Sequence, residues 1–246
     1  MESTQLSIII VNFRSEQFLT RCLASIYNVW GKEPEIIVVN NDIKESLVDI
    51  KRNFPKVKII KQQKNIGFGQ ANNAGAKIAQ GKYLLLLNPD TEVLADDLEK
   101  IFEKFEKNEE IAVIGPGLIT NKGETQEWCA GKEFTFWRLI KNNFGIIESK
   151  KIWESKNEIL TDWVSGAAFF VKKEIFDKAG GFDEHFFMYF EDDDLCRRIR
   201  KAGYAALYYP EFSIKHIRGQ CRESFLKQKI QYFKSMAHYA KKHLIS

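Results

Sequence analysis

Short apolar segments alternate with helical segments through the first half of the chain, and this alternation most limits the folds that the chain can adopt. Each apolar run is bounded by polar residues, which is typical of a strand buried on both faces of a parallel sheet. Strands are predicted at residues 6–12, 35–40, 56–60, 82–87 and 111–119. Strands that alternate with helices form βαβ units, so we predict an α/β fold with a mainly parallel sheet flanked by helices.

Helical patterns fill the gaps between these strands. Ser15 can cap a helix whose apolar side chains recur at spacings of three and four from Phe18 to Ile26. Two further helices are predicted at residues 69–80 and 95–107, the second with a clear amphipathic pattern.

The second half of the chain is less regular. Residues 121–160 are rich in aromatic side chains but show no clear period, so no elements are predicted there. A strand is predicted at residues 162–171, followed by a helix that ends at Gly180–Gly181. Residues 191–203 form a further predicted helix, with acids in its first turn and bases later.

The C-terminal segment is predicted to be a basic amphipathic helix. Residues 213–246 contain eight Lys or Arg against one acid, a charge of +7, so 4 − 7 leaves −3 for residues 1–212. No nucleic-acid-binding motif accompanies these bases, so an anionic membrane surface is the better partner. Apolar side chains form one stripe along this helix: Leu226, Ile230, Phe233, Ala237, Ala240 and Leu244.

The sequence shows no segment that would cross a membrane. Its longest apolar run, in residues 82–87, is far shorter than the ~20 residues that span a bilayer. The N-terminus has no basic region before its apolar stretch, unlike a signal peptide. We expect a cytoplasmic protein in peripheral contact with the inner face of the plasma membrane.

Polar residues follow each of the first four predicted strands. Parallel strands bring these ends to one edge of a sheet, where ligands bind in open α/β folds. A cap or a turn explains any one of them equally well, and Pro89 must end the strand before it. Together they indicate a nucleotide pocket: Asn12, Asn40, Asn41, Asp42, Asn65, Asn88 and Asp90.

The segment "NIGFGQANNAG" (65–75) offers a second nucleotide-binding feature. It departs from the dinucleotide fingerprint because Asn72 stands at the third glycine position. Gly67 and Gly69 still allow the backbone at a helix start to approach a phosphate closely. A loop with Asn caps is the alternative interpretation.

Acids and one histidine in the second half could do chemistry. Asp192 to Asp194 fit the first turn of a helix, but they follow the apolar run "FFMYF", which lowers the local dielectric. A carboxylate beside apolar rings gains proton affinity and can act as a general base. A lone histidine is more often structural, but His216 with Asp90 would suffice for a divalent ion bound to a diphosphate.

Several segments occur in a fixed order that resembles a known family. The resemblance is to the family 2 glycosyltransferases, particularly the rhamnosyltransferase-like bacterial members, which have a GT-A fold with a Rossmann-like sheet. It implies a domain at 1–220, with a nucleotide-sugar half (1–119) and an acceptor and catalytic half (120–220), before a basic helix at 221–246. The segments are "SIIIVNF", "EIIVVNN", "NIGFGQANN", "LLLLNPDTEV", "VSGAAFFVKKEIFDKAGGFDEHFFMYFEDDDLCRRIRKAGY" and "IKHIRG".

The resemblance implies roles for individual residues. Asp90 stands where the family usually has an Asp-x-Asp motif and would hold Mn²⁺ or Mg²⁺, with His216 completing the metal site. Asn88 replaces the first acid of that motif and is assigned to the ribose. Asn40 stands where an aspartate often reads the nucleobase, and Asp192 matches the catalytic base.

The resemblance also implies an activity. A dTDP- or UDP-sugar, with rhamnose as the sugar that the subgroup suggests, would pass with inversion to a saccharide or lipid-linked acceptor in bacterial surface polysaccharide synthesis. The alternatives are a non-catalytic nucleotide-sugar-binding protein and a sugar-phosphate nucleotidyltransferase. The latter needs a glycine-rich loop after the first strand, and "VNFRSEQ" has no glycine.

The predicted site has three further parts. Glu191 is placed beside the catalytic base. Acceptor contacts are predicted at Trp163, Ser165, Gly166 and Ala167. Donor contacts are predicted at Val11, Asn12, Asn40, Asn41, Asp42, Asn65, Gly67, Gly69, Asn72 and Asn88.

Overall fold

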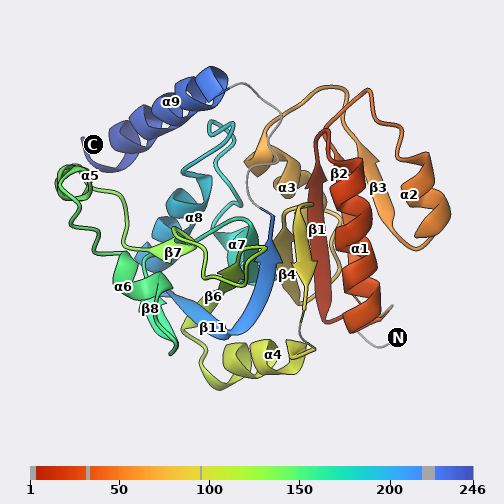
Figure 1. Cartoon of the computed structure of the whole chain (residues 1–246), viewed down its shortest axis with the longest axis horizontal. Coiled ribbons are helices and arrows are strands. Elements are labelled where there is room, and N and C mark those ends of the chain that lie inside the picture. The colour runs from red at the N-terminus through yellow and green to blue at the C-terminus, as the bar shows by residue number, and fades with distance from the viewer. Residues whose placement is uncertain (1–3, 32–33, 95, 218–224, 246) are drawn as a thin grey trace.

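A central sheet runs through both halves of the chain, with helices packed around it (Figure 1). The computed structural model describes residues 4–31, 34–94, 96–217 and 225–245. The sheet order is β3-β2-β1-β4-β10-β6-β11-β5, with β8 paired to β11. The first half contains β1 (Leu6–Asn12), α1 (Glu16–Trp30), β2 (Glu35–Asn40), α2 (Val48–Asn53), β3 (Lys58–Lys61), α3 (Phe68–Ala76), β4 (Tyr83–Leu87), β5 (Thr91–Val93), α4 (Leu98–Lys107) and β6 (Ile111–Ile119).

The strands β3, β2, β1 and β4 are parallel, as the sequence predicts for this part of the sheet. The chain passes from β1 outward to β2 and β3, and then returns to place β4 on the other side of β1. This reversal is a topological switch point, and in open α/β sheets the crevice at the carboxyl ends of the strands there binds ligands. Val11 lies near the end of β1, and Asn88 directly follows β4.

The second half of the chain makes the sheet mixed. Strand β10 runs antiparallel between β4 and β6, while β11 is parallel to β6 and antiparallel to β5 and β8. A separate small sheet joins β7 and β9. The elements are β7 (Ala130–Gly131), α5 (Phe136–Asn143), α6 (Lys150–Trp153), β8 (Ile159–Thr161), β9 (Trp163–Val164), β10 (Ala168–Lys172), α7 (Lys173–Lys178), α8 (Glu191–Lys201), β11 (Ala205–His216) and α9 (Phe225–His243).

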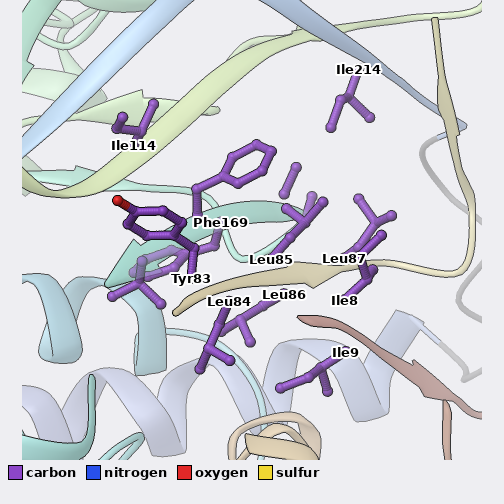
Figure 2. Packing of buried hydrophobic residues seen from close by; sticks show 14 of the residues in the cluster. Ile8, Ile9, Tyr83, Leu84, Leu85, Leu86, Leu87, Ile114, Phe169 and Ile214 are labelled. Carbon is purple, nitrogen blue, oxygen red and sulfur yellow. The ribbon is translucent and has the colours of Figure 1, made fainter. Parts of the chain in front are cut away.

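The hydrophobic core lies on both faces of strand β4. Its four leucines, 84–87, are fully buried, and successive side chains point to opposite faces of the sheet (Figure 2). Ile8 and Ile9 belong to β1, which pairs with β4 along one edge of the strand. Phe169 belongs to β10, which pairs with β4 along the other edge. Burying each such side chain contributes about 1.5–3 kcal/mol, which explains why the strand reads as an unbroken apolar run.

Two local predictions differ from the structure. Ser15 precedes α1 but makes no capping hydrogen bond; its Oγ donates instead to Asn12 Oδ1 over 2.9 Å. The strand predicted at 162–171 is divided into β9 and β10, because the chain turns between them at residues 165–167. This turn faces the cavity described below.

Helix α9 packs against α8 and away from the sheet (Figure 1). Tyr239 Oη donates to Asp193 over 2.8 Å, and the Lys242 ammonium lies 2.7 Å from the fully buried Asp194 carboxylate. Among the helices in the described ranges, none is both long and apolar enough to cross a bilayer.

Candidate functional site

A cavity of about 880 Å³ opens at the carboxyl ends of β1 and β4. Residues from both halves of the chain form its wall, since the second-half strands belong to the same sheet. It is large enough for a nucleotide-sized ligand. The predicted site residues that line it are Val11, Asn41, Asn65, Gly67, Asn88, Asp90, Trp163, Ser165, Gly166, Ala167, Glu191, Asp192 and His216.

Asp90 and His216 meet at one end of this wall. The pairing of β5 with β11 sets His216 opposite Thr91, and His216 Nε2 lies 3.3 Å from Asp90 Oδ1. His216 Nδ1 lies 2.8 Å from Gln126 Oε1, which can only accept a hydrogen bond. In the neutral imidazole, Nδ1 therefore carries the proton, and the lone pair of Nε2 faces the carboxylate. Two electron-rich atoms held this close suit a bound cation.

The loop before α3 is held by a network of amides. Asn41 Nδ2 donates to Asn65 Oδ1 over 2.9 Å and to the Gly67 carbonyl over 3.1 Å. Asn65 Oδ1 also accepts from the Gly67 N–H, and Phe68 N donates to the Phe187 carbonyl over 2.9 Å. These bonds hold the start of α3 at the cavity and tie it to the segment that precedes α8.

Two residues predicted to contact the nucleotide turn their side chains inward. Asn12 and Asn40 are buried and do not line the cavity. Asn12 Nδ2 donates to Asn40 Oδ1 and to Glu45 Oε2, while Asn40 Nδ2 donates to the Glu45 carbonyl over 2.7 Å. Their amides are therefore used to fix the loop after β2, and neither side chain is placed at the cavity, where direct contact with a nucleotide was predicted.

Three other residues predicted to contact the sugar donor also do not line the cavity. Asp42 is buried, accepts from the Lys44 N–H over 2.8 Å and lies near Arg14. Asn72 donates to the Phe68 carbonyl within α3. At Gly69, an added Cβ would lie 3.0 Å from Phe182 Cβ, so this glycine permits the close packing of α3 on Phe182.

Asp192 and Glu191 lie together in the first turn of α8. Asp192 Oδ2 accepts from the Gly166 N–H over 3.0 Å, and its Oδ1 accepts from the Asp193 N–H. Within the described residues, Glu191 Oε2 is buried without a hydrogen-bond partner. Burial, and then the charge of Asp192, raise the pKa of Glu191 well above its usual value. Burial also raises the pKa of Asp192, against the two N–H donors that favour its charged form.

These environments distinguish the two acids. Burial and the neighbouring charge of Asp192 favour the protonated form of Glu191, whose pKa is therefore raised well above its usual value. The carboxylate of Asp192 still accepts hydrogen bonds from backbone N–H groups, and burial raises its proton affinity. A general base has both properties.

The backbone before α8 is strained. Tyr189 and Phe190 have φ values of 73° and 67°, in the left-handed region that residues with a side chain rarely adopt. Tyr232 of α9 packs on both rings, at centroid distances of 5.8 and 5.2 Å. Such strain persists only where surrounding contacts fix it, and it is often found at functional sites.

Two further acids of α8 are engaged inside the protein. Asp193 accepts from Tyr239 Oη and from the Phe134 N–H, and burial raises its pKa to about 7. Asp194 is fully buried, and although burial opposes this, the charges of Arg198 and Lys242 lower its pKa. Neither can replace Asp192 as a base, since both oxygens of Asp193 are occupied and Asp194 does not line the cavity.

The predicted acceptor residues lie beside the acids. Trp163 Nε1 donates to the Lys132 carbonyl over 3.0 Å, which holds the indole at the wall. The turn at residues 165–167 presents the Gly166 N–H to Asp192. A Cβ at Gly166 would meet the Phe68 ring at 3.0 Å, so any other residue there would press against this ring.

Several residues of the wall were not selected from the sequence. Gln126, which contacts His216, is one example, and no motif or period singled it out in the weakly patterned segment 121–160. In the sequence, the aromatic residues before α8 stand out only as an apolar run. The missed lining residues include Gln126, Trp128, Phe134, Arg138, Phe190 and Tyr232.

Comparison with known proteins shows the family of this chain. Residues 7–193 match the family model of Glycosyl transferase family 2. The rhamnosyltransferase WbbL of Escherichia coli (strain K12) is 28% identical over 97% of this chain and 94% of its own length. The N-acetylglucosaminyl-diphospho-decaprenol L-rhamnosyltransferase of Mycobacterium tuberculosis (strain H37Rv) is 21% identical over 86% of this chain and 75% of its own.

A solved structure shows the same fold. The crystal structure of GalNAc-T7 with UDP, GalNAc and Mn²⁺ superposes with a TM-score of 0.67 at 19% identity, over 98% of this chain and 48% of that chain. The family match covers most of the sequence and includes both the strand-end edge and Asp192. The chain therefore belongs to glycosyl transferase family 2.

Proposed function

We propose that this glycosyltransferase moves a sugar, with inversion, from a nucleotide-diphosphate donor to an acceptor hydroxyl. The observation that carries the proposal is the meeting of two pairs in one cavity: Asp90 with His216, and Asp192 with Glu191. The first pair suits the charged diphosphate, and the second suits removal of a proton. A dTDP- or UDP-sugar fits the strand-end pocket, and the names of the relatives support rhamnose.

The two halves of the chain divide the work in this proposal. Residues 1–119 hold the donor through the Asn41–Asn65 loop, Gly67 and the ends of β1 and β4. Residues 120–220 supply the acceptor side and the base. The basic helix in 221–246 completes the wall through Tyr232.

Asp90 and His216 fit a divalent ion. They offer one carboxylate oxygen and one imidazole nitrogen to the cavity, and a diphosphate would complete the coordination. Mn²⁺ or Mg²⁺ satisfies this donor set, and the imidazole shifts the preference toward Mn²⁺. When bound, the ion neutralises charge that develops on the leaving diphosphate.

Asp192 removes the proton from the acceptor hydroxyl in this mechanism. The hydroxyl then attacks the anomeric carbon from the face opposite the diphosphate, which inverts the configuration. Gly166 keeps Asp192 in place through its N–H, and Glu191, whose pKa is raised by burial, lies beside it. General-base catalysis of this kind contributes typically 10²–10⁴-fold.

The acceptor is a saccharide or a lipid-linked saccharide in surface polysaccharide synthesis. The mycobacterial relative is named for a decaprenol-linked acceptor, which supports this class. The basic C-terminal segment supports a cytoplasmic enzyme in peripheral contact with the inner face of the plasma membrane.

A donor-binding assay tests the proposal directly. A panel of nucleotide sugars with Mn²⁺ should contain one donor that, at a hundred times its dissociation constant, stabilises the protein by about 2.7 kcal/mol. The same donor should release free nucleoside diphosphate when acceptor is present, and excess EDTA should stop the release. Donor binding without any turnover would favour a non-catalytic binding protein, and full activity in EDTA would exclude the metal-dependent mechanism.

A further inference from the structure

Helix α9 has two apolar faces, and only one of them is buried. Tyr239 and Ser235 pack against the body, and Tyr232 lines the cavity. Leu226 and Phe233, which lie on the opposite side of the helix by their spacing, are 67% and 57% exposed. The apolar stripe of α9 is thus turned largely toward solvent.

Helix α5 shows the same arrangement on the other side of the cavity. Arg138 and Asn142 line the cavity, whereas Trp137 and Phe144 point away from it and are 75% and 80% exposed. Thr135 caps the helix by accepting from the Arg138 N–H, so this orientation is fixed at its start. Large aromatic side chains exposed on two neighbouring helices mark an interaction surface.

The two helices lie at the same end of the molecule, away from β1, β2 and β3 (Figure 1). Phe134, directly before α5, packs on Tyr239 of α9 at a centroid distance of 5.9 Å. We define the outer α5–α9 surface by the exposed side chains of Trp137, Ile140, Phe144, Leu226, Ile230 and Phe233.

The charges on these helices are all positive. Neither the α5 nor the α9 sequence contains an acid, whereas α9 contains five lysines. Lys227, Lys234 and Lys241 are exposed and spaced by seven residues, so they border the apolar stripe of α9 along its length. An apolar stripe bordered by lysines is typical of a helix that lies in the interface of an anionic bilayer.

We propose that the outer α5–α9 surface docks on an anionic lipid bilayer, with both helices in the plane of the interface. The cavity lies between the inner faces of the same helices, so docking brings its mouth to the membrane. The proposal that the protein docks on lipid rests on the exposed apolar side chains and lysines of the outer α5–α9 surface. Docking would also bring a lipid-linked acceptor to the cavity, and this second step rests on the proposed function.

A vesicle flotation experiment with the full chain tests the docking. The protein should float with vesicles of phosphatidylcholine and phosphatidylglycerol, and binding should fall as salt rises, because salt screens the attraction. Leu226→Glu/Phe233→Glu should lower the binding at least tenfold. Val48→Glu/Ile78→Glu, which adds the same charge at exposed apolar positions of the first half, should leave it unchanged.

The readouts separate this proposal from the proposed function. Because Leu226 and Phe233 are exposed and outside the cavity, their double variant should keep the wild-type melting temperature and the shift caused by a nucleotide sugar. Equal flotation of this variant and the wild type would overturn the docking surface. A wild-type dimer that the variant dissociates, with no vesicle binding, would overturn it in favour of a second copy of the chain.

Discussion

Gln126 determines which nitrogen of His216 faces Asp90. Its Oε1 lies 2.8 Å from Nδ1, and this contact leaves the lone pair of Nε2 directed at the carboxylate 3.3 Å away. Partners of this kind orient a metal-binding histidine and typically change metal affinity by 10–100-fold when they are removed. Gln126 is therefore a positioning residue in the proposed metal site.

We predict that Gln126→Leu raises the Mn²⁺ concentration needed for half-maximal donor binding by about 10–100-fold. Calorimetric titration of the donor at a series of Mn²⁺ concentrations measures this. Gln126→Glu keeps an acceptor for Nδ1 and should stay near the wild type. An unchanged Mn²⁺ requirement in Gln126→Leu would show that the tautomer of His216 does not matter for the site.

Asp193 gives the stability of the protein a pH dependence. Its pKa is about 7 in the folded protein because of burial, and about 3.9 is usual in an unfolded chain. Between these values the folded state binds more protons than the unfolded state. The contribution of this group to stability is thus fully present below about pH 4 and is lost as pH rises through about 7.

Asp193→Asn should remove that contribution. Relative to the wild type, the free energy of unfolding of the variant should rise progressively from pH 4 to pH 7 and then level off, while sugar transfer persists. Denaturant titrations at several pH values measure the difference. Asp96→Asn, at an exposed position, is the matched control. A difference that does not vary with pH would mean that Asp193 ionises normally.

At the scale of elements, the start of α3 depends on one glycine. Gly67 has a φ of +88°, and an added Cβ would lie 2.5 Å from the Phe187 carbonyl oxygen. The same carbonyl accepts from the Phe68 N–H, so the loop before α3 and the segment before α8 are held together at this point. The segments proposed to bind the donor and to carry the base are therefore connected by a direct backbone contact.

We predict that Gly67→Ala destabilises the protein by more than about 3 kcal/mol, because backbone strain of about 1–3 kcal/mol adds to a clash with main-chain atoms. Gly31→Ala is the control, since Gly31 has a φ of +66° but open space around it. It should cost only the strain. If both variants lost the same free energy of unfolding in denaturant titrations, the proposed coupling between the loop before α3 and the segment before α8 would be wrong.

At the scale of the whole molecule, the sequence predicts the parallel half of the sheet well. Strands β1, β2 and β6 have the predicted bounds, because continuous apolar runs between polar residues identify buried strands. The alternation of parallel strands and helices also predicts the edge of the sheet at which the polar residues gather. The sequence predicts Asp90 and His216 as a pair, and His216 Nε2 lies 3.3 Å from Asp90 Oδ1.

Other features depend on long-range packing that a local pattern does not encode. Insertion of β10 antiparallel between β4 and β6 is one case, since its sequence suits either direction. The inward turn of the Asn12 and Asn40 amides depends on Glu45 in a loop. In α9, apolar residues occur on both faces, so only the packing against α8 decides which face is buried.

We propose that donor binding and proton removal depend on two different acids of one cavity, Asp90 and Asp192. Asp90 lies after β4, and Asp192 lies in α8, more than a hundred residues later in the chain. Substitutions at the two acids should therefore separate donor affinity from the rate of transfer. Asp90→Ala should weaken metal-dependent donor binding, whereas Asp192→Asn should keep it. The Asn carbonyl oxygen can still accept from the Gly166 N–H, and only the contact with the Asp193 N–H is lost, because the amide nitrogen cannot accept.

The most direct measurement is the rate of transfer by Asp192→Asn beside its donor dissociation constant, with Glu191→Gln and the wild type in parallel. We predict an unchanged dissociation constant and a transfer rate lower by at least about two orders of magnitude for Asp192→Asn, because the general base is lost. Near-normal transfer by Asp192→Asn, with loss in Glu191→Gln, would assign the base to the other acid. Near-normal transfer by both variants would contradict the catalytic role of this pair.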